Sequence, residues 1–418
     1  MAVDVGVFLP MLQADGEGQA AEFAAAARRA EELGFESVWA SGHLTGRAPM
    51  LDATVTLATA AAVTTRIRVG HGVLTLPVHQ VASLAQQLAS LQYLSRGRLL
   101  LGVDTGGSAW AQWRGGLVDT PAWAAAGVPY EERDERTDRA LEQLRSLLVG
   151  YPTRVGDTEL SLRPRVGWPP FLIGGESAAD LRRAVRHGGW FPNLASPAYL
   201  ARMIPRLRAL AAESRDTTPG VSVAVPATLD ATGTGERRAR PVDAVAAHRY
   251  GIDTERAAAT LVEGTPERAA EKLVEFARAG ADRIVLSFSD ADWRTQYELA
   301  ARAMESARAV LPVRRTATAG SQTSCGGWAR VTLDVERETG TYAFTNPLGD
   351  DALPADLAEA LEEGVREGLA GQGRVVRVHR AWVHEVDAHP GVFRAAGRKA
   401  VTEALAALAA ERAEAAGR

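Results

Sequence analysis

Four short stretches place glycine beside polar residues where a β-branched run of the sequence ends or breaks. They are Ser41-Gly42-His43, His71-Gly72-Val73, Asp104-Thr105-Gly106-Gly107 and Gly174-Gly175-Glu176-Ser177. Glycine inside a strand marks a bulge or the close approach of a ligand or another backbone. If the runs are parallel strands of a barrel, their carboxyl ends share the catalytic face, and the four stretches together form the candidate site.

The histidine at position 43 is the residue best suited to move a proton. His43 directly follows a predicted strand, and an imidazole accepts or donates a proton near pH 7. The alternative is a structural histidine, which is the commoner use of a lone one. His71 and His79 are eight residues apart, with no carboxylate or cysteine at ligand spacing, so we predict no metal site.

The glycine pair at 174–175 has two interpretations. The stretch Gly174-Gly175-Glu176-Ser177 stands between a predicted strand and a predicted helix, where free backbone N–H groups and a helix N-terminus could hold a phosphate. The same residues would also make a tight strand-to-helix connection. The chain has neither a G-x-S-x-G nucleophile elbow nor a G-x-x-x-x-G-K phosphate loop, which argues against a serine hydrolase and a P-loop nucleotide triphosphatase.

Eight β-branched runs in the first 310 residues must position these stretches. Amphipathic helices lie between the runs, such as one that ends on Gly34 and one that begins at Thr265-Pro266 and ends on Gly280. Eight strand–helix units with short connections predict an α/β fold, a (β/α)8 TIM barrel. The predicted strands are 3–9, 36–41, 67–74, 98–104, 171–175, 190–194, 221–229 and 282–288.

Two connections on the predicted catalytic face are too long for simple turns. They run from Thr105 to Tyr130 and from Asp230 to Gly264, and we expect lids or substrate walls there, with tolerated surface insertions as the alternative. Tryptophans in the first connection could line an apolar pocket or form a small core of the loop itself. The aromatic residues that hint at a partly apolar substrate are Trp110, Trp113, Trp123 and Tyr250.

The composition is that of an ordinary globular protein. Of 418 residues, 46% are hydrophobic and 23% are charged, and the net charge is -4. This balance disfavours nucleic acid and an anionic membrane as partners and leaves a small molecule or a protein. The single cysteine, Cys325, excludes an internal disulfide, and we interpret it as incidental. Neither a membrane-spanning apolar run nor a signal-peptide pattern is present, so we expect a cytoplasmic protein.

The chain changes character after residue 312. Residues 313–327 are rich in Arg, Thr, Ser and Gly and predict a linker between a barrel domain (1–312) and a C-terminal domain (328–418). The second domain is predicted to be a small α+β unit. Its predicted strands are 329–338, 341–347 and 374–383, and its predicted helices are 354–370 and the stretch from 393 onward.

Five blocks of the predicted barrel resemble the luciferase-like superfamily in order and spacing. They are GFESVWASGH, DATVTLATAAAVTTRIRVGHGVLTLP, LAQQLASLQYLSRGRLLLGVDTGG, PPFLIGGESAADLRRAVRHGGWF and GTPERAAEKLVEFARAGADRIVL. This superfamily contains two-component flavin monooxygenases and oxidoreductases that depend on coenzyme F420. The resemblance covers about residues 3–312 and implies a TIM barrel of the luciferase-like type.

The resemblance implies where the cofactor ring would lie. A non-proline cis peptide bond, here Gly72-Val73, would form a bulge that backs the deazaflavin ring. His43 matches a histidine near the reactive edge of the ring, and we expect it to be the catalytic proton donor or acceptor. The residue before that histidine is commonly acidic in the family but is Gly42 here, which indicates an altered proton relay.

The resemblance also implies a phosphate site. Thr105 and Gly106, which follow Asp104, match the phosphate-binding end of the fourth strand. The second side would come from the turn at 174–177, so the predicted cofactor-binding residues there are Gly174, Gly175, Glu176 and Ser177. Two further positions depart from the family: Gly107 replaces a glutamate of some F420 enzymes, and Gly188-Gly189-Trp190 replaces Asp-Gly-Trp.

The resemblance implies an enzyme that uses reduced F420 to transfer a hydride to or from an organic, peptide or natural-product substrate. The alternative cofactor is reduced FMN, supplied by a separate reductase to a monooxygenase. A third hypothesis is a non-catalytic binding protein that acts through its C-terminal domain.

Two blocks of the C-terminal domain resemble domain IV of elongation factor G. They are LPADLAEALEEGVREGLA and VVRVHRAWVHEVDAHPGVFRAAGRKAVTEAL, and the comparable tip loop would run from Trp382 to His389. The chain lacks a GTPase domain and this part is net negative, so ribosome binding is not expected. We favour recognition of a protein, peptide or carrier substrate, or contacts in a homodimer, over RNA binding.

Overall fold

The computed structural model describes residues 3–10, 20–42, 51–106, 120–214, 218–231, 254–288, 292–320, 327–337, 340–350, 352–383 and 388–416. The chain divides into two compact units. The first unit comprises residues 4–203 and 219–306, and the second comprises residues 1–3, 204–218 and 307–418.

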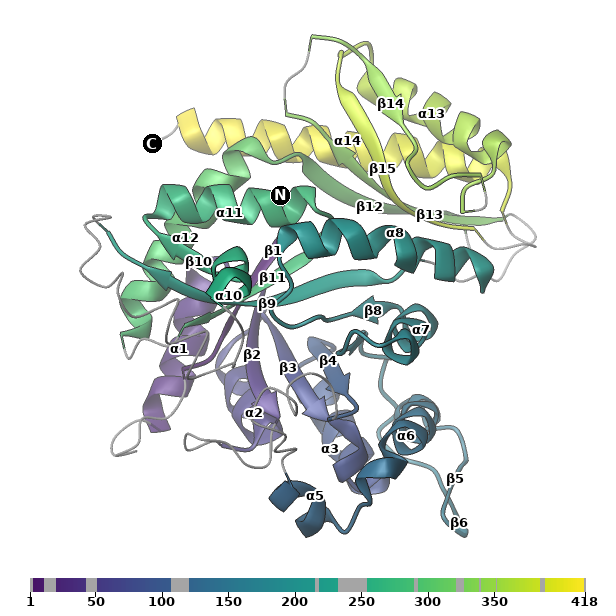
Figure 1. Cartoon of the computed structure of the whole chain (residues 1–418). Helices are drawn as coiled ribbons and strands as arrows, with labels where there is room; N and C mark the ends of the chain where they lie inside the picture. Colours follow the sequence, from purple (N-terminus) through teal and green to yellow (C-terminus); the bar gives the residue numbers. More distant parts are fainter. Residues whose placement is uncertain are drawn as a thin grey trace. The chain divides into compact units, whose positions relative to one another are not determined.

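Eight parallel strands of the first unit close into a barrel (Figure 1). Strand β9 pairs with both β8 and β11, and β11 pairs with β1, so the sheet has no open edge within this ring. The predicted (β/α)8 TIM barrel is therefore confirmed. In order around the barrel, the strands are β1 Asp4–Phe8, β2 Ser37–Gly42, β3 Arg68–Thr75, β4 Leu99–Asp104, β7 Phe171–Ile173, β8 Gly189–Trp190, β9 Gly220–Leu229 and β11 Arg283–Phe288.

One predicted strand is shorter than expected. Of the run predicted at 190–194, only Trp190 lies in β8 (Gly189–Trp190), and an isolated bridge from Asn193 to Ala224 follows it. Pro192 lies between them and has no backbone N–H to donate to a neighbouring strand.

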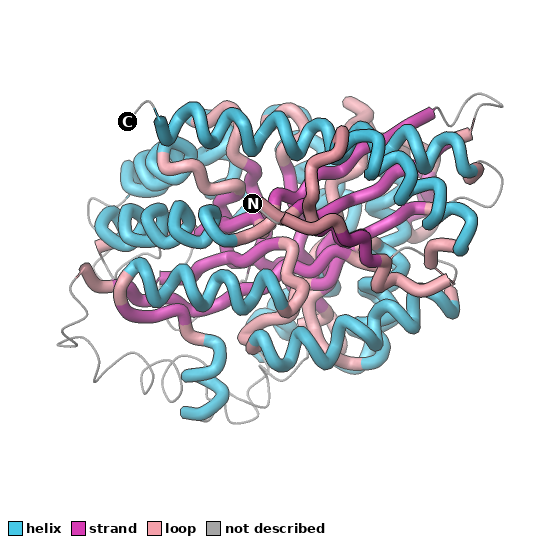
Figure 2. Tube along the Cα trace, turned by 90° about the horizontal axis from the view of Figure 1, so that it is seen from above, coloured by secondary structure: helices cyan, strands magenta, loops and turns pink. Residues whose placement is uncertain are grey.

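Helices flank the barrel strands (Figure 2). The predicted helix ends are confirmed: α1 stops just before Gly34, and α11 begins at Pro266 after Thr265 and stops just before Gly280. The helices up to residue 310 include α1 Ala20–Glu32, α2 Ala53–Val63, α3 Val81–Leu94, α6 Arg133–Leu148, α7 Ala178–His187, α8 Pro197–Glu213, α11 Pro266–Arg278 and α12 Trp293–Val310.

A buried ion pair joins four strands at their amino ends. The Arg283 guanidinium, in β11, donates to both carboxylate oxygens of Glu36 at 2.7 and 2.8 Å. It also donates to Ser222 Oγ in β9 at 3.1 Å and lies 3.7 Å from the Asp4 carboxylate in β1. This end of the barrel is therefore held together by hydrogen-bonded charge, opposite the end that carries the candidate site.

The two long connections are partly described. After β4, the chain forms α5 (Thr120–Ala126) and a 3-10 turn at Tyr130–Glu132. After β9, it forms α10 (Thr254–Thr260) and β10 (Val262–Gly264), and β10 pairs with β9. A short hairpin that the sequence analysis did not predict, β5 (Thr153–Val155) and β6 (Thr158–Leu160), precedes β7.

The second unit contains a four-stranded sheet and two long helices. The sheet order is β12 (Val313–Gly320), β13 (Trp328–Val335), β15 (Val375–Trp382) and β14 (Ala343–Thr345), with β14 and β15 parallel and the other pairs antiparallel. The predicted strands and helices of this part all form. Their bounds are β13 Trp328–Val335, β14 Ala343–Thr345, α13 Ala355–Leu369, β15 Val375–Trp382 and α14 Pro390–Ala416.

The predicted linker at 313–327 is wrong for its first half. Residues Val313–Gly320 form strand β12, which pairs along its whole length with β13. Val313 and Ala317 are buried in the core of the unit, while Arg and Thr side chains occupy more exposed positions of the strand. Threonine is favoured on such a half-buried strand, so an Arg- and Thr-rich composition did not require a flexible segment.

Helices α13 and α14 pack closely through glycine. An ideal Cβ on Gly364 would clash with the backbone carbonyl of Arg394, and one on Gly397 would lie 2.7 Å from the Leu361 carbonyl oxygen. Phe393, fully buried, belongs to the core between these helices and the sheet. Within the described ranges, no helix combines the length and the apolar character needed to cross a membrane.

Candidate functional site

The carboxyl ends of β1 and β3 carry partly buried apolar side chains. Phe8, the last residue of β1, and Val73 in β3 pack with Ala224 of β9 against a fully buried cluster in the barrel. That cluster consists of Trp39, Leu100, Leu172, Phe191 and Val285. Flat, partly exposed apolar surface above a packed core is suited to holding one face of an aromatic ring.

Strand β3 breaks at the position where the sequence shows Gly-His-Gly. The peptide bond Gly72-Val73 is cis, as the resemblance predicted, and the register of β3 with both neighbouring strands shifts at this point. The missing side chains are explained by the barrel's own aromatic rings. An ideal Cβ on Gly70 would lie 2.5 Å from Trp39 Cε3, and one on Gly72 would lie 2.8 Å from Phe8 Cζ.

Asp104 ends β4 with a carboxyl group beside this break. Its Oδ1 accepts a hydrogen bond from the Gly106 backbone N–H at 3.0 Å, and the Thr75 hydroxyl donates to the same carboxylate. Burial raises the pKa of Asp104 to about 7, against the lowering effect of these two hydrogen bonds, and the negative charge of Asp180 adds to the rise. Asp104 is therefore poised to change charge near neutral pH.

The turn after β7 lies directly beside Asp104. Gly174 N–H donates to the Val103 carbonyl at 2.8 Å, and an ideal Cβ on Gly174 would lie 3.0 Å from Asp104 Cβ and 3.8 Å from Val73 Cγ1. Gly175 has a φ of 97° and its carbonyl accepts a hydrogen bond from Trp190 Nε1 at 2.9 Å. The ends of β3, β4 and β7 therefore meet at one place.

Ser177 and Asp180 close the start of α7 with a reciprocal pair of hydrogen bonds. Asp180 N–H donates to Ser177 Oγ at 3.1 Å, while Asp180 Oδ2 accepts from both the Ser177 N–H at 3.1 Å and the Ser177 hydroxyl at 2.7 Å. This is a capping box, which satisfies backbone donors of the first helical turn with the chain's own side chains.

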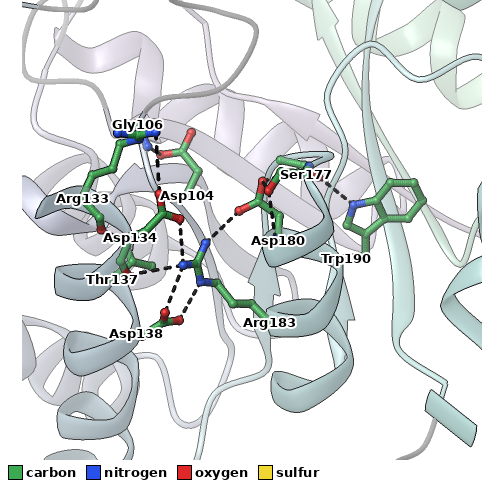
Figure 3. Close-up of polar contacts among 11 residues, drawn as sticks. Asp104, Gly106, Arg133, Asp134, Thr137, Asp138, Ser177, Asp180, Arg183 and Trp190 are labelled. Atoms are coloured by element: carbon green, nitrogen blue, oxygen red, sulfur yellow. Dashed lines mark hydrogen bonds and ion pairs between the residues drawn. The ribbon is translucent and has the colours of Figure 1, made fainter. Parts of the chain in front are cut away.

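A single buried arginine connects α7 to α6 (Figure 3). Arg183 donates to Asp180 at 3.1 Å within α7 and reaches the carboxylates of Asp134 at 2.8 Å and Asp138 at 2.6 Å on α6. Burial disfavours the charged guanidinium, but the hydrogen bonds to Asp138 and Asp134 raise the pKa of Arg183 overall. The single positive charge of Arg183 is thus shared among three carboxylates, next to the turn at 174–177.

The structure brings most of the predicted cofactor-binding residues together. Gly72 and Val73 of β3, the residues Asp104, Thr105 and Gly106 after β4, and the turn at 174–177 all lie at the carboxyl ends of adjacent strands. The predicted catalytic residue His43 lies outside the described residues. Gly107, Trp110, Trp113, Tyr250 and Cys325 also lie outside them.

Trp123 is the described tryptophan of the long connection after β4. It is 4% exposed and packs edge to face on Tyr130, with ring centroids 5.2 Å apart. An ideal Cβ on Gly106 would lie 3.0 Å from the Trp123 ring. Trp123 therefore belongs to a small local core that supports the turn after β4.

His71 is buried and His79 half-buried, near the start of α2. His71 Nε2 lies 3.1 Å from Thr54 Oγ1, and burial, together with His79, lowers the pKa of His71 to about 3. Burial also lowers the pKa of His79. In the part of the chain that the structure describes, no three His, Cys, Asp or Glu side chains gather as a metal site would require.

Sequence reasoning missed three residues of this region: Thr75, Asp180 and Arg183. Their spacing gave only a weak indication of these contacts: Asp134 and Asp138 lie one helical turn apart, as do Asp180 and Arg183, so each pair shares a helix face. The contact between the two helices depends on the tertiary fold.

The site fits one part of the implied cofactor better than another. The apolar surface formed by Phe8 and Val73 suits a flat ring. Three of the predicted phosphate residues already use their donors within the chain: the Gly106 N–H donates to Asp104, the Gly174 N–H to the Val103 carbonyl, and the Ser177 N–H and hydroxyl to Asp180. The negative charge of a phosphate placed here would also face the Asp104 and Asp180 carboxylates, so these residues fit a phosphate less well than they fit a neutral group.

A protein-family comparison matches residues 3–283 to the luciferase-like monooxygenase family. An uncharacterised protein of Mycobacterium tuberculosis is 34% identical over 177 residues, which are 41% of this chain and 58% of the relative. An F420-dependent glucose-6-phosphate dehydrogenase of Kineococcus radiotolerans is 37% identical over 31% of this chain and 35% of the relative. A 4-hydroxyprotoasukamycin monooxygenase of Streptomyces nodosus subsp. asukaensis is 30% identical over 38% of this chain and 43% of the relative. The chain thus spans little more than half the length of these curated relatives at most.

Solved structures show the same fold. An F420-dependent secondary alcohol dehydrogenase, in complex with an F420-acetone adduct, matches with a TM-score of 0.58 and 17% identity over 74% of this chain and 100% of that one. The oxygenating constituent of 3,6-diketocamphane monooxygenase from Pseudomonas putida, in complex with FMN, matches with a TM-score of 0.57 and 16% identity over 72% and 97%. At these identities the likeness establishes the fold of the barrel.

Proposed function

Because the chain belongs to the luciferase-like monooxygenase family, we propose that it is an oxidoreductase that binds the ring of reduced F420 at the carboxyl ends of β1 and β3. The hydride would pass to or from an organic substrate, with a peptide or natural product as the substrate class. The observation that carries this proposal is the shift in the register of β3 between His71 and Leu74, beside the partly exposed Phe8 and Val73.

The chain's own residues would do three things in this reaction. The apolar surface at Phe8 and Val73 would exclude water from one face of the ring, and the bound cofactor would supply the hydride. Asp104, whose pKa is raised to about 7, could hold a proton at Oδ2 at the edge of the same surface. His43 stays our predicted proton donor or acceptor.

Reduced FMN is the alternative cofactor. A relative named as a monooxygenase and a structural neighbour in complex with FMN support it. In that case a separate reductase would supply the reduced flavin, and the reaction would insert oxygen. The two cofactors share a tricyclic ring, so the apolar surface at β1 and β3 does not choose between them.

A titration of the full chain with F420 and with FMN, each oxidised and reduced under anaerobic conditions, tests the proposal by fluorescence. Preferential, saturable binding of F420 would support hydride transfer. A preference for reduced FMN would instead support a monooxygenase reaction. Absence of binding by either ring would overturn the oxidoreductase proposal and favour a binding protein.

The second unit supports a separate proposal, that it recognises a protein, peptide or carrier substrate or forms homodimer contacts. Trp382 at the end of β15 is flanked by two guanidinium groups, Arg330 at 4.7 Å and Arg380 at 5.7 Å from its ring centroid. Tryptophan and arginine are enriched at protein contacts. This is also where the resemblance to elongation factor G domain IV places the tip loop, and that resemblance stays a proposal.

Sedimentation equilibrium of the wild-type chain and of Trp382→Ala separates the two uses of this unit. A dimer that dissociates on substitution would assign the unit to dimer contacts. A monomer in both cases would remove the dimer alternative. Arg139→Ala, an exposed site on α6, serves as the matched surface control.

A further inference from the structure

We infer that the barrel binds a cofactor whose polar end is a neutral polyol rather than a phosphate, because Asp104 and Asp180 already accept the hydrogen bonds of the Gly106 N–H and of the Ser177 N–H and hydroxyl. This inference rests on the proposed function, since it concerns the same ring-binding site. It names the class of cofactor as a phosphate-free flavin or deazaflavin nucleoside.

The first argument is the state of the donors after β4. Oxyanions of phosphates are held by backbone N–H groups and hydroxyls at such turns. Here the Gly106 N–H donates to Asp104 Oδ1 at 3.0 Å, and the Thr75 hydroxyl donates to the same carboxyl group. The Asp104 carboxylate therefore accepts hydrogen bonds that a bound phosphate could otherwise accept.

The second argument is the matching state of the turn after β7. Ser177 gives both its N–H and its hydroxyl to Asp180 Oδ2, at 3.1 and 2.7 Å. The N–H of Gly174 is bonded to the Val103 carbonyl at 2.8 Å. Asp180 also lies against the turn itself, because an ideal Cβ on Gly175 would come into contact with Asp180 Oδ2.

The third argument is the local charge. Asp104 feels the negative charge of Asp180 across the two turns. Behind Asp180, Arg183 neutralises one charge among the carboxylates of Asp180, Asp134 and Asp138. Arg133, at the start of α6, lies 3.7 Å from Asp134. A phosphate would add negative charge next to the buried Asp180, where like charges repel. Asp134 and Asp138 are about half exposed, so water screens their share of the repulsion.

A polyol, unlike a phosphate, can donate hydrogen bonds to the carboxylates of this site. Hydroxyl groups of a ribityl chain are donors, and a carboxylate accepts hydrogen bonds through four lone-pair positions. Asp104 uses one position for Gly106 and another for Thr75, which leaves acceptor capacity on the carboxylate. Charge-assisted O–H···O⁻ bonds of this kind are stronger than neutral ones.

The test compares phosphate-bearing and phosphate-free probes with the same ring. The full chain is titrated at pH 8 with riboflavin and FMN, and with F420 and its phosphate-free ribityl deazaflavin, by fluorescence quenching. We expect the phosphate-free member of at least one pair to bind about tenfold tighter, which corresponds to about 1.4 kcal/mol. Equal or tighter binding of the phosphate-bearing member in both pairs would overturn the inference and leave the proposed function standing. If none of the four binds, both are overturned.

Two substitutions sharpen the test. Asp104→Asn removes the charge and keeps the shape, so it should tighten FMN or F420 at least fivefold and close the gap within the pair. Asp157→Asn makes the same change at an exposed turn of the β5–β6 hairpin and should change nothing. An unchanged preference in Asp104→Asn would contradict the role of this carboxylate. The comparison of probes on the wild-type chain keeps the inference falsifiable if Asp104→Asn does not fold.

Discussion

The Trp39 indole fills the space in which a side chain on residue 70 would have to lie. An ideal Cβ on Gly70 would lie 2.5 Å from Trp39 Cε3 and 2.7 Å from two other atoms of the same ring. Trp39 is fully buried and its Nε1 donates to Ser37 Oγ at 2.8 Å. The buried and hydrogen-bonded Trp39 ring therefore cannot move aside for a side chain on residue 70, which explains why this position in a buried strand is glycine.

Gly70→Ala should therefore destabilise the barrel. Forcing one methyl group into this contact should lower the free energy of unfolding by about 2 kcal/mol, since overpacked cores lose stability on this scale. Chemical denaturation followed by tryptophan fluorescence measures the change. Gly167→Ala is the control, because no atom lies within 4 Å of an ideal Cβ there. Equal stability of the two variants would contradict the packing argument.

The fold of the barrel could be predicted because its strands are local patterns. Each is a short β-branched run, and the helices between them carry their own end signals, such as Thr265-Pro266 at the start of α11. The linker prediction failed at β12 because composition does not report pairing: Val313 and Ala317 face a core formed by distant residues. Pairing partners far along the chain decide whether a polar run becomes a strand.

The candidate site could be predicted only as a set of strand ends. Parallel topology placed Val73, Asp104 and Gly174 together, as expected. The hydrogen bonds that fill the predicted phosphate site could not be foreseen, because they depend on local backbone conformation at Gly106 and on the capping box at Ser177. A residue type indicates which hydrogen bonds are available, and the fold decides which are already taken.

Removal of Arg283 should destabilise the amino end of the barrel. Arg283→Met removes the two hydrogen bonds at 2.7 and 2.8 Å from the partly buried Glu36 carboxylate, which keeps Arg68 at 3.5 Å. Because Arg68 remains, the loss should be about 2 kcal/mol, below the roughly 3 to 5 kcal/mol that is typical when a fully buried ion pair is broken. Thermal and urea unfolding of the full chain would measure the loss. The exposed pair of Arg139 and Glu135 supplies the control, since Arg139→Met should change stability by less than about 0.5 kcal/mol.

His71 should make the barrel sensitive to acid. Burial lowers the pKa of His71 to about 3 in the folded protein from an ordinary value of 6.5. Below pH 6.5 the unfolded chain takes up a proton that the folded chain refuses, so the free energy of unfolding falls as the pH falls from 6.5 toward 3. The loss should reach about 3 kcal/mol by pH 4.5. Stability curves of His71→Phe should lack this slope, and a slope equal to that of the wild type would exclude His71 as its source.

Asp104 should have the opposite effect, because its folded pKa is raised. Between its ordinary pKa of 3.8 and the folded value of about 7, the folded chain keeps a proton that the unfolded chain releases. The free energy of unfolding therefore falls as the pH rises through this window and levels off above it. Asp104→Asn should be more stable than the wild type at pH 8 by up to about 4 kcal/mol, and of similar stability at pH 4. If Asp104→Asn and the wild type were equally stable at both pH values, the pKa of Asp104 would not be raised in the folded chain.

Helix packing in the second unit should depend on Gly364 more than on any change of helix propensity. Alanine is the better helix former by about 1 kcal/mol, so Gly364→Ala would stabilise α13 if the helix stood alone. In the structure, an ideal Cβ at this position would clash with the Arg394 carbonyl of α14, which is backbone and cannot rotate away. The two helices would have to separate, which would loosen the contacts that bury Phe393 and Leu361. We therefore expect a net loss of about 2 kcal/mol, measured as urea unfolding of the second unit by circular dichroism in the full chain. Glu359→Ala, at an exposed side chain earlier in α13, is the matched control. A gain in stability for Gly364→Ala would show that propensity outweighs packing and that α13 and α14 can move apart at little cost.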